Sequence, residues 1–501
     1  MGKGSKHVAV IGAGLGGISS AIMLAKKGYR VSLLEKNSHL GGKLNRLETG
    51  GFKFDLGPSI FTLPQYFRPL FEGDGKRLED YVDLVRVDPQ WRNFFEDGQV
   101  VDLWENEDRM RSELERFGGD AYADYRAFLR YSKKQYDLCE KGYFAKAPDD
   151  LWQFIRAYKF FGAFGIDYAK TMSQSISERV REPHLRSIFE YFIKYVGSSA
   201  NASPGFMNLM PNIQFEFGLW YVQGGLYKLA EALERRLAEV SVDVQLDTEV
   251  VGMKIAGPGV SGVKISRAGG ERRTIEVDAV VSNMEVIPCY EKLLGDQATA
   301  KSLEKFEPAC SGIVLHLGTK KIYPQLAHHN FFYSRNQTAH FEKVFTHKQL
   351  PDDPTIYLVA PTRSDPSQAP PGHDNIKILP HIPYINDKSP FTYEDCVRLK
   401  DRVIDKLERM GLTDLRKNTV VEDFWTPFDI EKKYYSNKGS IYGVVSDLKK
   451  NFAFKAPKKS HRYENLYFVG GSVNPGGGMP MVVLCGQHVA NLVEREVPSS
   501  R

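Results

Sequence analysis

The chain has 501 residues, of which 42% are hydrophobic and 26% are charged, and its formal net charge is +5. This length exceeds the size at which one hydrophobic core stops growing, so we expect two or more domains, and the composition excludes a disordered chain. A small surplus of 67 basic over 62 acidic residues does not indicate a nucleic-acid partner.

The first 34 residues have the pattern of a βαβ unit. A strand is expected at residues 7–11, a helix at 16–27 and a second strand at 30–34, with Gly28 at the C-cap of the helix. The apolar run at the start is short and leads directly into a glycine motif, so we interpret it as a strand and not as a signal peptide.

The turn of this unit carries the motif GxGxxG at Gly12, Gly14 and Gly17. The first glycine allows a tight turn, the second lets the backbone approach a pyrophosphate, and the third allows close helix packing. Glu35 follows the second strand, where a carboxylate accepts hydrogen bonds from a ribose hydroxyl. The pattern predicts an adenine dinucleotide site, to which we also assign Leu15, Gly16 and Lys36, and it leaves FAD and NAD both open.

The rest of the chain divides by pattern. Residues 78–210 are mostly helical and rich in aromatic residues, 240–281 alternate short strands with glycine turns, and 393–411 form an amphipathic helix. The final segment returns to strand, glycine loop and helix. We therefore predict an α/β protein with a dinucleotide domain from discontinuous segments and an inserted substrate region. The dinucleotide domain takes residues 1–75, 215–290 and 440–501, the helical, membrane-facing substrate part 76–214, and the β-rich substrate domain 291–439.

The segment "EKNSHLGGKLNRLETGGFKFDLGPS" resembles the flavin amine oxidase and carotenoid desaturase superfamily. The resemblance implies FAD as the cofactor, held by a Rossmann-like domain of the amine oxidase (GR2) type with an inserted α+β substrate domain. It implies that Gly42 and Lys43 lie against the FAD pyrophosphate, that Gly57 and Pro58 belong to the same site, and that Val250 contacts the adenine.

The segment "YFVGGSVNPGGGMPMVVLCG" is similar to the last FAD motif of that superfamily. It implies that Gly470 and Gly471 approach the ribityl chain, and that the helix from residue 480 points its N-terminus at the flavin ring. The backbone donors there would be Met481 and Val482. Ser472 stands where many members have an acidic residue, so that contact is lost or becomes a hydroxyl hydrogen bond.

Segments such as "FIKYVGSS", "EFGLWYVQGG" and "SIYGVVSD" resemble the branch of the superfamily that oxidises linear C30 carotenoids. This implies an oxygenase that converts terminal methyl groups of diaponeurosporene or diapolycopene to aldehydes. Its partners would be the lipophilic carotenoid, O2 and an external electron donor, since only one dinucleotide fingerprint is visible. Asn474 and Gly477 stand where desaturases usually have His and Ala, so we expect this pair to alter the space beside the flavin ring.

Two alternatives stay open. One is an FAD-dependent carotenoid desaturase of the phytoene or dehydrosqualene type, and the other is a flavin-less prenyl or lipid-binding protein of the same superfamily. The adjacent His328 and His329 are interpreted as a surface or hydrogen-bonded pair without a chemical role. No metal motif is visible, no metal is expected, and no catalytic acid or base is assigned.

Membrane contact is expected to be peripheral, because no stretch reaches the ~18 uninterrupted apolar residues of a spanning helix. A helix from Leu151 has apolar residues Phe154, Ile155, Tyr158 and Phe161 on one face and Lys159 on another. It either packs on the core or lies in a lipid interface. A carotenoid substrate favours the second interpretation, so we expect peripheral or monotopic binding at the cytoplasmic face of the cell membrane. The scattered cysteines fit a reducing cytoplasm.

Overall fold

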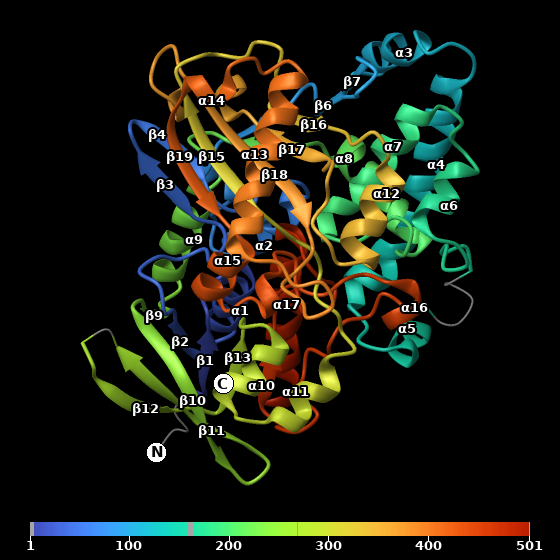
Figure 1. The fold of residues 1–501 in the computed structure, drawn as a ribbon. Coiled ribbons are helices and arrows are strands. Elements are labelled where there is room, and N and C mark those ends of the chain that lie inside the picture. Colours follow the sequence, from blue (N-terminus) through green and yellow to red (C-terminus); the bar gives the residue numbers. More distant parts are fainter. Residues whose placement is uncertain (1–4, 159–163, 268, 500–501) are drawn as a thin grey trace.

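The computed structural model describes residues 5–158, 164–267 and 269–499 (Figure 1). Its centre is a five-stranded parallel sheet in the order β20-β13-β1-β2-β9. β1 is buried along its whole length, as expected for a strand of a parallel sheet covered on both faces. The strands are β1 (His7–Ile11), β2 (Arg30–Leu34), β9 (Asp243–Gln245), β13 (Ala279–Ser282) and β20 (Leu466–Phe468).

Three segments far apart in the sequence build this sheet and its helices. Helix α1 (Leu15–Lys26) packs along the last helix, α17 (Met479–Glu496), and also contacts α9 (Lys228–Glu239). The two predicted strands of the βαβ unit are confirmed, and α1 begins one residue before the prediction. The Rossmann-like α/β fold built from discontinuous segments is therefore confirmed.

An antiparallel three-stranded sheet and two short helices extend this domain. The sheet has the order β10-β11-β12, and its first strand has a register shift between Val250 and Gly252. These elements are β10 (Thr248–Ala256), β11 (Gly259–Arg267), β12 (Arg272–Glu276), α10 (Val286–Leu293) and α11 (Gln297–Leu303).

The substrate region contains a large mixed sheet in the order β19-β15-β18-β17-β16-β6-β7, in which β14 also pairs with β18. Its later strands are β14 (Ser311–Gly312), β15 (Val314–Thr319), β16 (His329–Phe332), β17 (Ile356–Val359), β18 (Asp374–Ile382) and β19 (Thr419–Trp425). Its helices are α12 (Gln337–Phe341), α13 (Tyr393–Arg409), α14 (Leu415–Asn418) and α15 (Pro427–Tyr434).

The region predicted to be helical also supplies strands. β6 (Trp91–Phe94) pairs in parallel with β16 and antiparallel with β7 (Val100–Leu103), so this segment is part of the large sheet. The sequence pattern missed these strands because both are only four residues long and nearly all buried, so they lack a clear alternation. The three domain boundaries stay a prediction.

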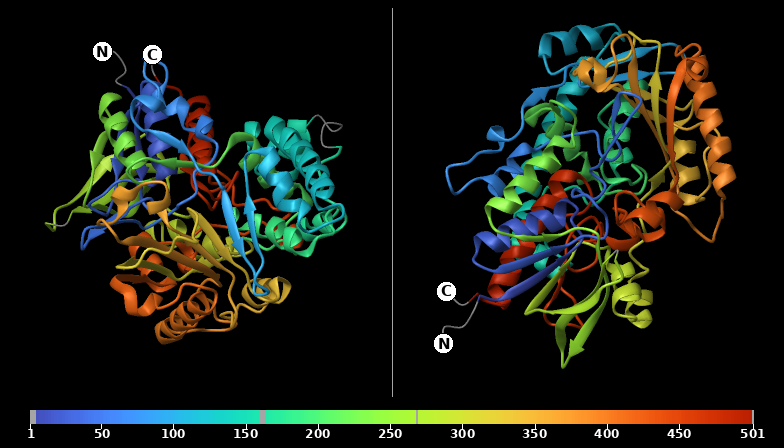
Figure 2. Two further views of the ribbon diagram at one scale, coloured as in Figure 1. Left: turned by 90° about the horizontal axis from the view of Figure 1, so that it is seen from above. Right: turned by 90° about the vertical axis from the view of Figure 1, so that its left-hand side faces the viewer.

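The helices of that region stand together at one side of the molecule (Figures 1 and 2). They are α3 (Glu107–Glu115), α4 (Ala121–Cys139), α5 (Leu151–Tyr158), α6 (Met172–Ser177), α7 (Pro183–Tyr191) and α8 (Leu209–Phe217). A π-helical turn at Glu140–Phe144 continues α4. The remaining short elements are α2 (Arg68–Phe71), α16 (Leu448–Asn451) and the strand pairs β3 (Arg46–Thr49) with β4 (Phe52–Asp55) and β5 (Leu84–Arg86) with β8 (Trp220–Val222).

Helix α5 packs on the core, as one of the two interpretations predicted, and the lipid-interface interpretation stays a prediction. Phe154 and Tyr158 are buried, and the Tyr158 hydroxyl donates to the Leu138 carbonyl in α4 at 3.0 Å. Leu151 and Trp152 are instead 60% and 81% exposed. The predicted face residues Lys159 and Phe161 lie outside the described residues. Across the ranges given above, no helix is both long enough and apolar enough to span a bilayer.

Candidate functional site

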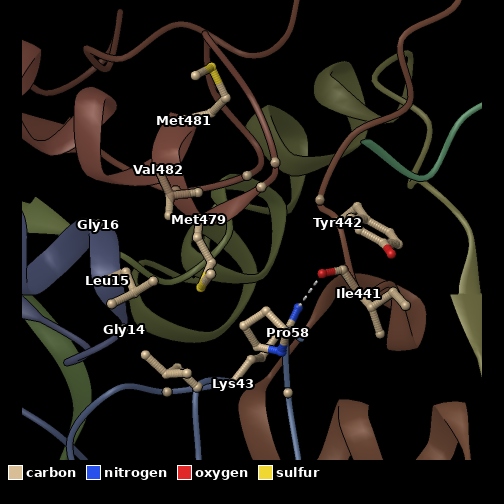
Figure 3. A pocket seen from close by; sticks show the side chains of 18 of the residues that line it. Gly14, Leu15, Gly16, Lys43, Pro58, Ile441, Tyr442, Met479, Met481 and Val482 are labelled. Carbon is tan, nitrogen blue, oxygen red and sulfur yellow. Dashed lines mark hydrogen bonds between the residues drawn. The ribbon is translucent and has the colours of Figure 1, made fainter. Parts of the chain in front are cut away.

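A cavity of about 460 Å³ runs from the carboxyl ends of the parallel strands to the large sheet and the helices. Figure 3 shows Gly14 to Gly16 at the start of α1 on the left, Tyr442 on the right, and Met479, Met481 and Val482 of α17 above and between them. Sixteen of the predicted residues line it: Gly12, Gly14, Leu15, Gly16, Glu35, Lys36, Gly42, Lys43, Gly57, Pro58, Val250, Gly470, Gly471, Gly477, Met481 and Val482. Gly17, Ser472 and Asn474 lie behind its wall.

The first glycine turn has no room for side chains. Gly12 has a φ of +89°, which favours glycine. A Cβ on Gly17 would come 2.1 Å from the carbonyl oxygen of Gly12, so this position serves the packing of α1 and does not face the cavity.

Backbone N–H groups of this turn without a protein acceptor are available to a ligand in the cavity. Within the part of the chain that the structure describes, the N–H groups of Gly14, Leu15 and Gly16 have no acceptor from the protein. They stand at the N-terminus of α1, where unpaired N–H groups and the helix dipole attract an anion. Their arrangement fits the pyrophosphate of FAD.

Glu35 is buried and fixed from both sides. One carboxylate oxygen accepts from the N–H of Ala13 at 2.7 Å, and the other accepts from the N–H and the side-chain amide of Asn37 at 2.9 and 2.7 Å. A carboxylate has further acceptor sites, so it can also accept from a ribose hydroxyl in the cavity that it lines.

Asn283 is a cavity residue that the sequence did not identify. It follows β13 directly, and its side-chain oxygen accepts from the N–H of Gly17 at 3.1 Å. A Cβ on Gly14 would come 2.7 Å from the Asn283 amide nitrogen, and a Cβ on Gly16 would come 2.8 Å from the amide oxygen. Asn283 therefore buttresses the glycine turn, and a polar residue directly after a buried strand was the available signal.

The second glycine pair closes over the first. Gly41 donates to the carbonyl of Ala13 at 2.9 Å, and a Cβ on Gly42 would come 3.0 Å from the Cα of Gly14. Lys43 then reaches across the cavity, where its Nζ donates to the carbonyls of Ser440 and Ile441 at 3.0 and 3.3 Å (Figure 3). Burial lowers the pKa of the Lys43 amine, and nearby Glu285 opposes that shift.

The C-terminal glycine loop is interleaved with the loop that contains Tyr442. Cβ atoms on Gly471 and Gly477 would come 2.7 and 2.3 Å from the Tyr442 carbonyl oxygen, and a Cβ on Gly443 would come 2.3 Å from the backbone of Gly471. The density of glycine thus serves the close packing of two loops as well as any approach to the cofactor. Tyr442 was not among the predicted residues, although its segment was part of the resemblance.

Three predicted residues have protein partners that change their expected roles. The N–H of Val482 donates to the carbonyl of Gly478 at 3.0 Å, so Val482 is not a free backbone donor as predicted, whereas Met481 has no such partner in the described chain. Ser472 accepts from the N–H of Val286 at 3.2 Å. Asn474 donates to the carbonyl of Pro148 at 2.9 Å and accepts from the Tyr143 hydroxyl at 3.1 Å. Any influence of Asn474 on the cavity is therefore indirect.

The opposite end of the cavity is built from large side chains of distant segments, among them Tyr195, Phe206, Tyr357, Leu379, Trp425 and Tyr442. Buried lysines also line it. Burial lowers the pKa of Lys377 to about 8 and that of Lys455 to about 7, and it lowers the pKa of Lys194 far below its ordinary value.

The histidine pair lies outside this cavity wall. His328 and His329 are buried and each makes a hydrogen bond, so of the two predicted alternatives the hydrogen-bonded pair is confirmed and the surface position is not. Their Nδ1 atoms lie 2.7 Å from the Ser364 hydroxyl and 2.9 Å from the Tyr357 hydroxyl. Burial lowers the pKa of His328 to about 3. Among residues 5–158, 164–267 and 269–499, no three His, Cys, Asp or Glu side chains are grouped to hold a metal.

Known proteins resemble this chain along its whole length. A chain from Methylomonas sp. named 4,4′-diapolycopene oxygenase is 52% identical over 494 residues, 98% of each chain. A Staphylococcus aureus chain named 4,4′-diaponeurosporene oxygenase is 49% identical over 500 residues, 99% of this chain and 100% of the other. Among solved structures, a putrescine oxidase has a TM-score of 0.64 at 14% identity, with 98% of this chain and 99% of the other covered.

The family model described as "Flavin containing amine oxidoreductase" matches residues 15–493. That span includes α1 from its first residue, the Lys43 segment and most of α17, all of which contribute residues to the dinucleotide end of the cavity. The chain therefore belongs to the flavin containing amine oxidoreductase family, and it is an FAD-dependent oxidoreductase.

Proposed function

We propose that this protein is an FAD-dependent oxygenase that converts terminal methyl groups of linear C30 carotenoids to aldehydes with O2 and an external electron donor. The observation that carries the proposal is the full-length identity of about half to oxygenases named for diapolycopene and diaponeurosporene. The cavity supports it, because a glycine-lined dinucleotide end continues into an end with aromatic and aliphatic walls.

The reaction balances in two oxidations. A terminal methyl group, O2, two electrons and two protons give a primary alcohol and water. A second equal step gives a gem-diol and water, and the gem-diol loses water to leave the aldehyde. The donor must supply two electrons each time. FAD supplies the redox chemistry that passes these electrons to O2.

The chain's own residues bind and orient the polyene. Phe206, Leu379 and Trp425 give the cavity apolar walls, which exclude water and hold a conjugated chain by its faces. The loop of Tyr442 packs on the glycine loop before α17, so the walls of the substrate end are fixed relative to the dinucleotide end. The shape of these walls then determines where the terminal methyl group lies relative to the dinucleotide end.

Labelled oxygen tests this function. The protein is purified in detergent, its flavin spectrum is recorded, and it is incubated with 4,4′-diaponeurosporene, 18O2 and a reductant. We expect an aldehyde that carries 18O when it is reduced quickly to the alcohol with a hydride reagent, which keeps the oxygen and prevents its exchange with water. A product with additional double bonds and no oxygen would replace the proposal by a desaturase, and a protein that retains no flavin would replace it by a lipid-binding function.

We further propose that α5 docks on the cytoplasmic face of the membrane. The exposed Leu151 and Trp152 are apolar side chains beside the exposed cation of Arg156, a combination suited to an interface of acyl chains and anionic headgroups. The same helix supports the cavity wall, because the Tyr158 hydroxyl accepts from the N–H of Tyr143, whose side chain lines the cavity. A lipid-dissolved substrate would thus enter next to the membrane.

Vesicle binding tests the docking surface. Replacing Trp152 by Ser should weaken co-sedimentation with anionic vesicles by about tenfold, since burying a large apolar side chain stabilises by ~1.5–3 kcal/mol. Ile322→Ser, at a residue that is 42% exposed in another part of the chain, is the matched control and should leave binding unchanged. Equal binding by the Trp152 variant and the unaltered protein would contradict the proposal.

A further inference from the structure

Lys194 is the unusual lysine of the cavity. It lies in the short helical turn Phe192–Val196, lines the cavity, and is only 5% exposed. Four other cavity lysines, at positions 36, 43, 377 and 455, donate to backbone carbonyls or hydroxyl groups. In the described chain, the Lys194 amine has no hydrogen-bond or ion-pair partner.

Aromatic rings surround this amine. Its Nζ lies 3.8 Å from the ring centre of Tyr357, 4.5 Å from that of Phe331, and 5.1 Å from those of Trp91 and Tyr195. Trp91 and Phe331 are fully buried behind the wall, whereas Tyr195 and Tyr357 line the cavity. The amine therefore faces the cavity from a box that holds it in place without using its N–H groups.

The residue after Lys194 lies close to the glycine loop before α17, although the two segments are far apart in the sequence. The carbonyl oxygen of the next residue, Tyr195, would be 3.6 Å from a Cβ on Gly478, the N-cap of α17. Lys194 acts on the imidazoles of His329 and His381, and burial is the larger cause that lowers the pKa of both. Neither provides a carboxylate that would neutralise or occupy the amine.

We propose that Lys194 binds the oxygen that the first oxidation introduces, and so holds the half-oxidised carotenoid for the second oxidation. This rests on the proposed function. The hydrocarbon end has no acceptor for an N–H group, whereas the alcohol has one, so an unused donor in an apolar wall distinguishes the alcohol from the hydrocarbon. Burial keeps water from competing for the same donor.

The test compares the hydrocarbon 4,4′-diaponeurosporene with its terminal alcohol in Lys194→Met, which keeps the length and removes the donor. We expect the KM for the alcohol to rise about tenfold and alcohol to accumulate from the hydrocarbon. The kcat/KM for the hydrocarbon should change by less than about twofold. Lys320→Met, at an exposed lysine, is the matched control. Equal loss on both substrates, or an unchanged KM for the alcohol, would overturn the inference.

Binding without turnover separates this inference from the proposed function. Equilibrium binding of the alcohol to the oxidised, FAD-loaded protein should weaken about tenfold in Lys194→Met, while hydrocarbon binding stays the same. That result supports Lys194 even if the unaltered protein forms no aldehyde, an outcome that would remove the proposed function alone. Lys194→Leu is measured in the same way in case the methionine variant does not fold, and a variant that binds the alcohol as well as the unaltered protein contradicts the role.

Discussion

The two ends of the cavity differ in what lines them, because backbone lines one end and large side chains line the other. At the dinucleotide end, backbone such as that of Gly14, Gly16 and Gly42 forms the wall, and it comes from short motifs that are each contiguous in the sequence. At the substrate end, side chains such as those of Phe206, Tyr357 and Trp425 form the wall, and they come from segments widely separated in the sequence. A dinucleotide site is thus encoded locally, whereas the substrate end depends on the whole fold.

This difference sets how each end responds to substitution. An added methyl group at Gly17, Gly42 or Gly57 meets backbone that cannot move without shifting a strand or helix. An altered side chain at the substrate end changes shape or polarity, while the surrounding backbone stays in place. Substitutions at the first end should therefore cost cofactor and fold together, and those at the second should cost less.

The largest effect is expected for Gly17→Ala. Its Cβ would lie 2.1 Å from the carbonyl oxygen of Gly12, so the turn and α1 must separate. We expect purified protein without flavin absorbance and a loss of stability of about 3 kcal/mol or more. Gly269→Ala is the control, because a Cβ there meets nothing within 4 Å. A Gly17→Ala protein that is stable and retains flavin would contradict the expectation that the backbone at this end cannot move to accept a side chain.

Lys455 lines the cavity beside the C-terminal glycine loop, and its titration tests whether a buried amine in the cavity wall is charged. Its pKa is about 7 in the folded protein and ordinary, 10.5, in the unfolded chain. Between these values the unfolded chain binds a proton that the folded protein does not, so stability rises with pH across this window. Relative to Lys455→Met, the unaltered protein should gain about 2 to 3 kcal/mol from pH 7 to pH 9 in urea unfolding.

A flat difference between the two proteins would contradict that expectation. It would mean that the hydrogen bonds from Lys455 to the Val444 carbonyl and the Ser446 hydroxyl, at 3.0 and 3.1 Å, keep the amine charged despite its burial. Any pH-independent cost of leaving that carbonyl without a donor cancels when only the pH dependence is compared.

A smaller effect is expected for Asn283→Ala, which removes the side chain that supports the glycine turn. The N–H of Gly17 would lose its acceptor, at a cost of about 1 to 2 kcal/mol in the free energy of unfolding. FAD should be retained more weakly but not lost, because the glycine backbone itself is unchanged. Asn283→Asp keeps the acceptor oxygen and should retain more of the stability. Complete loss of flavin in the alanine variant would show that a side chain, not backbone, controls this end.

The contrast between the two ends also explains what the sequence could predict. The strand, turn and helix around Gly12 follow from periodicity and glycine spacing, and the helix after the last glycine loop begins at Met479, one residue from the expected position. These features depend on residues close together in the chain. Asn283 gives only the local signal of a polar residue after a buried strand, and neither its role nor that of Tyr442 follows from periodicity or glycine spacing, because each acts through contacts with segments distant in sequence.

The same reason limits what the sequence says about substitutions. The pair of Asn474 and Gly477 invites exchange for His and Ala to test the chemistry beside the flavin. In the fold, however, a Cβ on Gly477 would come 2.3 Å from the Tyr442 carbonyl oxygen, so that exchange displaces a loop before it changes any chemistry. The clash depends on a contact between two loops, which no local pattern reports.

The smallest effect is expected for Tyr442→Phe at the substrate end. The Tyr442 hydroxyl lies 3.3 Å from His381 Nε2, and His381 Nδ1 lies 3.2 Å from the Tyr191 hydroxyl, so three side chains form a line that resembles a proton path. A general acid or base contributes about 10² to 10⁴ in rate, so a working path would lose that much. Burial lowers the pKa of His381 to about 3, so it stays neutral at physiological pH and accepts no proton from Tyr442. We therefore expect kcat within about threefold of the unaltered protein, and a fall of a hundredfold or more would show that this wall takes part in proton transfer.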